Sequence, residues 1–68
     1  MYILEHTQND DLGDVFRMSD GRSVFVNQHT VGFLGGHPSN VDYYYSEGGY
    51  NCKTAREVAI VFATQFPQ

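Results

Sequence analysis

The sequence contains very little of two residue types, cysteine and tryptophan. It contains one cysteine, Cys52, so no disulfide can form within the chain, and it contains no tryptophan. Small secreted domains usually carry several cysteines. The first residues show neither the basic region nor the apolar region of a signal peptide. These absences predict a cytoplasmic protein, residing in the host cytoplasm if it is encoded by a phage.

Positive charge and long apolar runs are also scarce. Four Lys and Arg stand against eight Asp and Glu, which gives a net charge of −4. Four cations are too few to follow a phosphate backbone, so we expect no nucleic-acid binding. The longest apolar run, Val58 to Ala63, is far shorter than the ~20 residues of a membrane-spanning helix. We therefore expect no membrane partner.

The apolar residues that are present are sufficient for a folded chain. Leu, Ile, Val and Phe number 17 of 68, above the ~20% below which chains tend to stay disordered. No linker or repeat divides the sequence, which predicts a single domain over residues 1–68. A chain this short has a small core, so oligomerisation or partner binding is an expected source of added stability.

The clearest local signal is a β-hairpin over residues 14–27. Asp20 and Gly21 lie between two β-rich runs, which predicts a two-residue type I′ turn. Counting outward from that turn places Phe16 opposite Phe25 and Val15 opposite Val26. This register puts two sets of apolar residues on opposite faces: Phe16, Met18 and Phe25 on one, and Val15, Val24 and Val26 on the other. Both faces are apolar, so the pattern leaves open which one covers the core.

Further strands are expected before and after this hairpin. Residues 2–8 suit a strand with Tyr2, Leu4 and His6 on one face, and residues 9–13 suit a turn. The glycine-rich residues 28–40 are interpreted as a loop anchored on the sheet by Val31, Phe33 and Leu34, with a short strand or helical turn near residues 29–33. Residues 41–46 alternate like a strand.

The C-terminal segment over residues 54–66 is predicted to be helical. Thr54 and Glu57 have the spacing of a capping box, and Pro67 ends the pattern. The competing interpretation is a strand, because residues 58–62 are apolar and β-branched in part. The chain is therefore expected to be an α+β protein, with a small antiparallel sheet of about four strands in the order β-β-β-β-α and one C-terminal helix packed on one face.

Catalytic or cofactor chemistry finds weak support in the sequence. His29, His37 and Cys52 lack the paired spacings of zinc sites, because the nearest two histidines are eight residues apart. The glycines at positions 32, 35 and 36 precede His37 and Pro38, not the Lys-Ser/Thr pair of a phosphate loop. A short sheet with one helix rarely encloses a catalytic cleft. We therefore expect no enzyme, no cofactor and no metal.

The most informative cluster is aromatic. Tyr43, Tyr44, Tyr45 and Tyr50 lie within eight residues and are flanked by Asp42 and Glu47. Tyrosine is enriched at protein interfaces, and the acidic flanks favour a partner with a basic or mixed surface. The alternative is that these rings cover a small core with their hydroxyls at its rim. Ile60, on the polar side of the predicted helix, adds a further exposed apolar point.

These features favour a small acidic protein-interaction module, an adaptor or inhibitor that binds a larger protein. A phage-encoded inhibitor of a host enzyme or defence complex has this size and charge. The alternative is a homo-oligomer, a homodimer for example, with a structural or small-ligand role.

Overall fold

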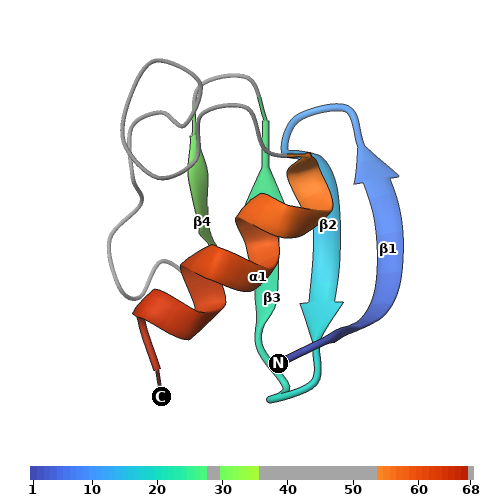
Figure 1. The fold of residues 1–68 in the computed structure, drawn as a ribbon. Helices are drawn as coiled ribbons and strands as arrows, with labels where there is room; N and C mark the ends of the chain where they lie inside the picture. The colour runs from blue at the N-terminus through green and yellow to red at the C-terminus, as the bar shows by residue number, and fades with distance from the viewer. Residues whose placement is uncertain (28–29, 36–53, 68) are drawn as a thin grey trace.

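The computed structural model describes residues 1–27, 30–35 and 54–67. It contains four strands and one helix: β1 (Ile3–Asn9), β2 (Gly13–Met18), β3 (Ser23–Val26), β4 (Val31–Phe33) and α1 (Ala55–Gln65). The strands form one antiparallel sheet in the order β1-β2-β3-β4, and α1 crosses one face of it (Figure 1). This confirms the predicted α+β architecture.

The β1–β2 hairpin is closed by a turn rich in side-chain bonds. The Asn9 side-chain oxygen accepts hydrogen bonds from the backbone N–H groups of Asp11 and Leu12, at 2.8 and 3.1 Å. Gly13 follows with a φ of +88°, a conformation that L residues rarely adopt. An added Cβ at Gly13 would lie 2.5 Å from the Val26 carbonyl oxygen, so this position also needs the space that glycine leaves.

A β-bulge corrects the predicted faces of β1. The register with β2 shifts between Ile3, which pairs with Met18, and Glu5, which pairs with Arg17. The extra residue, Leu4, breaks the strict alternation. Ile3 therefore lies on the same face as His6, whereas the alternation had placed it with Glu5.

The β2–β3 hairpin has a different register from the predicted one. The Gly21 N–H donates to the Met18 carbonyl at 3.0 Å, and the Met18 N–H donates to the Arg22 carbonyl at 2.8 Å. The loop therefore contains three residues, 19–21, with Gly21 at a φ of +95°, instead of a two-residue type I′ turn.

The longer loop shifts the pairing by one residue. Phe16 pairs with Val24 instead of Phe25, and Val15 pairs with Phe25 instead of Val26. A one-residue slip moves a side chain to the other face of a sheet. Phe25 accordingly lies opposite the face that holds Phe16.

The fourth strand is β4, a short segment within the predicted loop. Val31 pairs with Val26 and Phe33 pairs with Val24, and both β4 side chains are buried. Two of the three predicted anchors are thus confirmed, whereas Leu34 is 46% exposed. The predicted strand at residues 41–46 lies outside the described residues.

The C-terminal segment is helical, as predicted. The Thr54 side chain accepts a hydrogen bond from the Glu57 N–H at 3.2 Å, and the Glu57 carboxylate accepts one from the Thr54 N–H at 2.9 Å. This reciprocal capping box satisfies two donors at the helix start. Together with the burial of one helical face, it accounts for a helix where the β-branched residues would also allow a strand.

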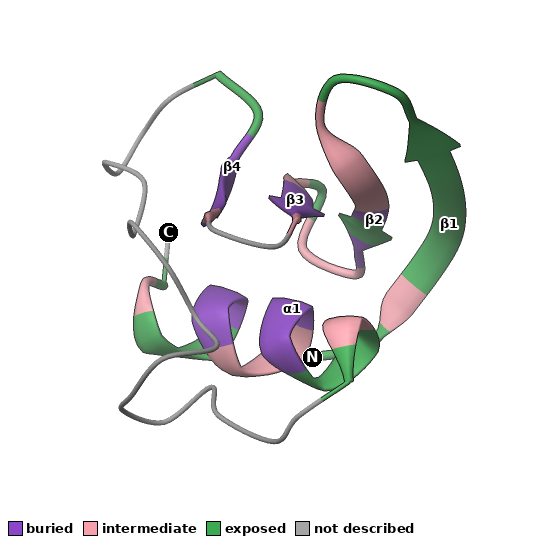
Figure 2. Ribbon diagram, turned by 90° about the horizontal axis from the view of Figure 1, so that it is seen from above, coloured by how far each residue is buried: buried purple, intermediate pink, exposed green. Residues whose placement is uncertain are grey.

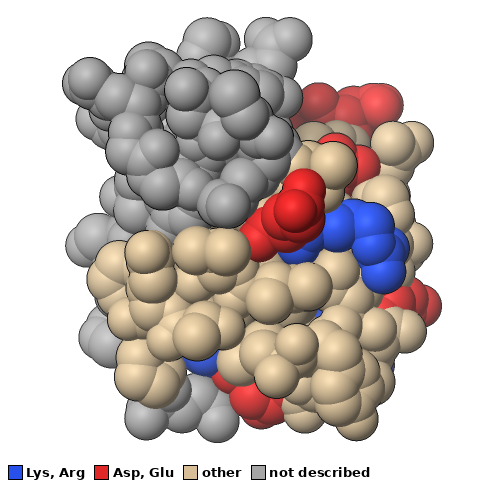
Figure 3. Space-filling view, in the orientation of Figure 1, with Lys and Arg blue, Asp and Glu red and all other residues tan. Residues whose placement is uncertain are grey.

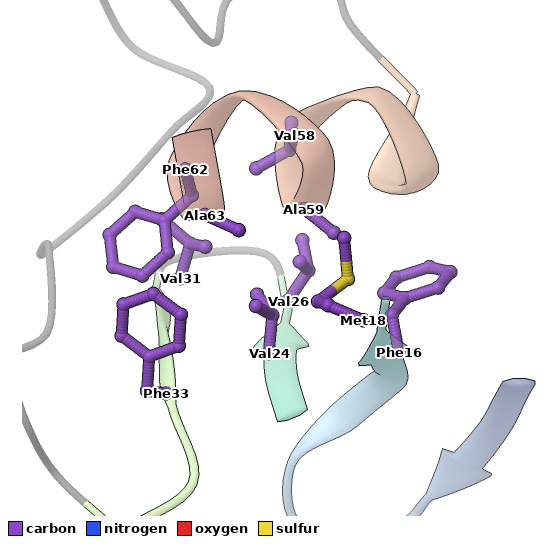
Figure 4. Close-up of a cluster of buried hydrophobic side chains, with 10 residues drawn as sticks. All are labelled: Phe16, Met18, Val24, Val26, Val31, Phe33, Val58, Ala59, Phe62 and Ala63. Carbon is purple, nitrogen blue, oxygen red and sulfur yellow. The ribbon is translucent and has the colours of Figure 1, made fainter. Parts of the chain in front are cut away.

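The core lies between α1 and one face of the sheet. Figure 4 shows side chains of β2, β3, β4 and α1 converging there, and Figure 2 shows that the buried parts of α1 face the strands. We call this face of the sheet the helix side. The buried cluster consists of Phe16, Met18, Val24, Val26, Val31, Phe33, Val58, Ala59, Phe62 and Ala63. No buried polar or charged residue occurs among the described residues.

Candidate functional site

The predicted interface residues lie mainly outside the described part of the chain. This applies to Asp42, Tyr43, Tyr44, Tyr45, Glu47 and Tyr50, and also to His29, His37 and Cys52. Ile60 is described, and it is half-buried and packs against the core cluster. It does not project freely from the polar side of α1, because the helix lies close enough to the sheet to cover part of that side chain.

Three exposed apolar side chains gather at the start of β1. Met1, Tyr2 and Leu4 are 47%, 64% and 55% exposed. We call them the N-terminal tip. Scattered exposed apolar residues are ordinary, but a group of them beside a hollow is typical of a binding surface. Figure 2 shows the exposed β1 at one side of the sheet.

The backbone of the N-terminal tip is held against the β2–β3 loop. The Tyr2 N–H donates to the Ser19 hydroxyl oxygen at 3.0 Å, and the Ser19 N–H donates to the Tyr2 carbonyl at 2.8 Å. The Ser19 hydroxyl also approaches the Met1 sulfur at 3.5 Å. These bonds fix the path of the chain before any partner binds, which lowers the ordering entropy lost on binding.

A hollow of about 370 Å³ opens beside the N-terminal tip, between the β2–β3 loop and the end of α1. We call it the clamp groove. It is lined by Met1, Asp20, Arg22, Ala63, Thr64 and Pro67. Figure 3 has the orientation of Figure 1, and the lower part of the face that it shows is mostly uncharged, with small areas of charged side chains. Its volume falls in the range of small-ligand pockets, ~300–1,000 Å³.

Arg22 forms one wall of the clamp groove and joins the hairpin to the helix. Its guanidinium contacts the Asp20 carboxylate, with Nε at 2.6 Å and Nη2 at 2.5 Å from Oδ2. Nη2 also donates to the Ala63 carbonyl at 3.0 Å, and Nη1 donates to the Phe66 carbonyl. The guanidinium carbon lies 4.3 Å from the centre of the Phe33 ring. We call these contacts the arginine clamp.

The arginine clamp places a positive charge at the C-terminal end of α1. The last turn of α1 contains no basic residue, and the carbonyl groups at a helix C-terminus carry partial negative charge. Arg22 reaches these carbonyls from the hairpin. Four of the five N–H groups of its side chain are engaged in this way, so little donor capacity is left for an anionic ligand. The clamp groove is therefore better suited to an apolar side chain than to a phosphate or carboxylate.

The Asp20 carboxyl responds to the same contacts. Its partial burial raises the pKa, but the hydrogen bonds and the positive charge of Arg22 outweigh burial, and the pKa lies below its ordinary value. Asp20 also accepts a hydrogen bond from the Arg22 N–H at 3.0 Å. The carboxylate is thus ionised at neutral pH and neutralises the guanidinium locally.

A second polar group lies at the other end of β1. The Asp14 Oδ1 atom is 2.9 Å from His6 Nε2 and accepts a hydrogen bond from Gln8 Nε2 at 3.3 Å. The His6 ring stacks on Phe16, with centres 4.4 Å apart. A hollow of about 310 Å³ adjoins this group. The described residues contain no group of three or more metal-ligating side chains, so this arrangement is interpreted as a polar cover over the edge of the core.

The N-terminal tip was not identified from the sequence. Tyr2 and Leu4 were placed in a strand, but the prediction of an interface relied on the tyrosines at positions 43–50. The signal that points to the tip is the composition of β1: after Leu4, its residues are all polar. A strand of that composition belongs at a sheet edge, where apolar residues at its end are exposed.

Comparisons with protein-family models, with curated proteins and with solved structures found no match. In the described part of the chain, no helix has the length and apolar character needed to cross a membrane.

Proposed function

We propose that the protein is a small acidic interaction module, an adaptor or inhibitor that acts by binding a larger protein and not by catalysis. The observation that carries this proposal is the N-terminal tip: three exposed apolar side chains, with the Tyr2 backbone held by Ser19 and with Met1 lining the clamp groove. Interface hot spots combine aromatic anchors with adjacent pockets. Tyr2 and Leu4 are the anchors on this surface.

The charge distribution supports a partner with a basic or mixed surface. The chain carries a net charge of −4, and the one cation lining the clamp groove is already paired with Asp20. Acidic charge around an apolar patch steers association toward positive surfaces and contributes more to the association rate than to the final affinity. The acidic flanks Asp42 and Glu47 of the tyrosine cluster add to this charge. A phage-encoded inhibitor of a host enzyme or defence complex is the specific form that we propose.

The test compares a double variant of the N-terminal tip with a matched control. Tyr2→Ala/Leu4→Ala removes two exposed apolar side chains from the tip, and Leu34→Ala removes one of similar exposure just after β4, at the opposite edge of the sheet. Both proteins should unfold at nearly the parent temperature. In affinity capture from host lysate, the tip variant should recover at least tenfold less of the captured protein, whereas Leu34→Ala should recover it fully.

A third variant, Tyr44→Ala/Tyr45→Ala, separates the two candidate surfaces. Loss of capture in this variant with full capture by the tip variant would assign binding to the tyrosine cluster. Equal capture by all variants and by an unrelated acidic domain would contradict the interaction module itself.

The exposed strand β1 favours a second function, that of a homo-oligomer with a structural or small-ligand role. Six of its seven residues are exposed. Light scattering over a dilution series tests this function, and a monomer at every concentration would contradict it.

A further inference from the structure

Strand β1 is an unpaired edge of the sheet among the described residues. It pairs with β2 on one side, and its residues from Leu4 to Asn9 are exposed. Figures 1 and 2 both show it as the outermost strand, on the side away from β4. An edge strand presents a row of unpaired N–H and C=O groups, which is a template for pairing with another strand. Between Ile3 and Asn9 the edge carries no lysine and no proline, the residues that commonly block such pairing.

We propose that β1 pairs with β1 of a second copy of this chain, antiparallel, about a two-fold axis at Thr7. This inference rests on the homo-oligomer, the second function proposed above, and specifies its strand and register. The bulge at Leu4 limits the regular part of β1 to residues 5–9, because the register shifts between Ile3 and Glu5. Thr7 is the middle residue of that segment, so a two-fold axis there uses all of its length.

The register centred on Thr7 brings complementary side chains together. Glu5 lies opposite Asn9 of the second copy, and Thr7 lies opposite its own counterpart. The Asn9 side-chain oxygen already accepts two backbone hydrogen bonds, and its amide N–H groups are the donors that it can offer to a carboxylate. Cross-strand Thr–Thr pairs are favourable in antiparallel sheets.

Pairing of the two β1 strands would join the two sheets into one. The side chains on the other face of this joined sheet are compatible with the same register. His6 lies opposite Gln8 of the second copy, and both side chains are held by Asp14 in their own copy. No like charges stand directly opposite each other on either face. A C2 interface requires this kind of self-complementarity, in which each residue and its partner exchange roles.

The registers centred on Glu5 and on His6 are less favourable. An axis at Glu5 places two carboxylates directly opposite, which is destabilising. An axis at His6 brings the bulge residue Leu4 into the paired region, where the backbone is irregular. Thr7 is therefore the favoured centre.

The experiment uses symmetric cross-linking in a Cys52→Ser background. Residues directly opposite in an antiparallel pair have Cα atoms ~4.5 or ~5.5 Å apart, both within disulfide range. Thr7→Cys should therefore form a disulfide dimer in oxidised glutathione, which takes up the two electrons released by the two thiols. Glu5→Cys is the matched control on the same face, because its counterpart would lie four residues away, ~14 Å.

The expected result is at least a tenfold excess of cross-linked dimer for Thr7→Cys over Glu5→Cys. A mixture of Glu5→Cys with Asn9→Cys should cross-link as fast as Thr7→Cys. Equal cross-linking of Thr7→Cys and Glu5→Cys overturns the register. A Cys52→Ser parent that stays monomeric by light scattering at millimolar concentration overturns the pairing and the homo-oligomer together.

A charge at the axis gives an independent measurement without a disulfide. Thr7→Lys places two ammonium groups opposite each other and should raise the dissociation constant at least tenfold. Gln65→Lys, at an exposed helical position that does not line the clamp groove, adds the same charge and should leave it nearly unchanged. Equal weakening by both substitutions overturns a contact at Thr7. Neither outcome depends on capture of a different protein, so failure here is distinguishable from failure of the interaction module.

Discussion

Strand β1 and the strands β3 and β4 belong to one hydrogen-bonded sheet but differ in how far their side chains are buried. In β3 and β4, six of seven residues are buried. In β1, six of seven are exposed; Ile3 packs against the core, and the exposed His6 covers its edge by stacking on Phe16. Strands β2 to β4 and α1 therefore supply most of the apolar burial in the described residues, whereas β1 contributes backbone pairing and an accessible surface. Under the proposed function, stability and recognition are thus divided between different strands of one sheet.

The largest expected effect on the free energy of unfolding comes from a substitution among the buried side chains. Phe62→Ala should lower the free energy of unfolding by about 3–5 kcal/mol, because it leaves a cavity next to Phe33, whose ring centre is 4.7 Å away. Leu4→Ala, on the exposed strand, should change it by less than about 0.5 kcal/mol. Urea unfolding of both variants measures the difference. Similar losses would mean that β1 carries more of the core than its exposure indicates.

The secondary structure was largely predictable because its signals are local. The Thr54–Glu57 spacing determines the start of α1 independently of how the strands pair. The Asp20-Gly21 dipeptide indicates a turn whether the loop has two or three residues. The register was not predictable from that dipeptide, since it suits a two-residue loop and also a three-residue loop with Gly21 in the left-handed region. One extra loop residue was enough to place Phe25 on the wrong face.

The candidate site was less predictable, for a different reason. Leu4 lies at the bulge and β1 lies at the edge of the sheet, and neither feature can be read from β1 alone because both depend on its pairing with β2. The contacts of Arg22 with α1 were not predictable from the sequence, because its helix partners Ala63 and Phe66 are more than forty residues away. Contacts of that separation leave no periodic trace in the sequence.

A second prediction contrasts two glycines with the same backbone requirement. Gly13→Ala should lower the free energy of unfolding by about 2–3 kcal/mol, because the left-handed φ and the close Val26 carbonyl both oppose a Cβ. Gly21→Ala should lower it by about 1 kcal/mol, since the space around it is open and the φ alone is unfavourable. Denaturation midpoints at an unchanged m-value provide the measurement. Equal losses of stability in the two variants would mean that a small shift of the backbone relieves the close contact between the added Cβ and the Val26 carbonyl oxygen.

The smallest expected effect concerns the arginine clamp and its pH dependence. Asp20→Asn should cost about 1 kcal/mol at pH 7, because the ion pair with Arg22 is replaced by a hydrogen bond from the guanidinium to an uncharged amide. The folded pKa of Asp20 lies below its unfolded value, so the carboxylate contributes fully above that unfolded value, about 3.9, and less as the pH falls through the folded pKa.

The difference between parent and Asp20→Asn should therefore be constant near neutral pH and shrink in acid. Unfolding curves from pH 7 to pH 2 measure it. A difference that stays constant down to pH 2 would contradict the assignment of the pKa shift to this pair.

The arginine clamp also has a kinetic consequence. Each hairpin joins neighbouring segments, but the bonds from Arg22 to Ala63 and Phe66 close intervals of 41 and 44 residues. Such contacts lose more chain entropy on closure and are expected to form after the local hairpins. Interactions formed after the folding barrier slow unfolding and leave the folding rate nearly unchanged. We therefore expect the arginine clamp to form late in folding and to prolong the lifetime of the native state by slowing unfolding.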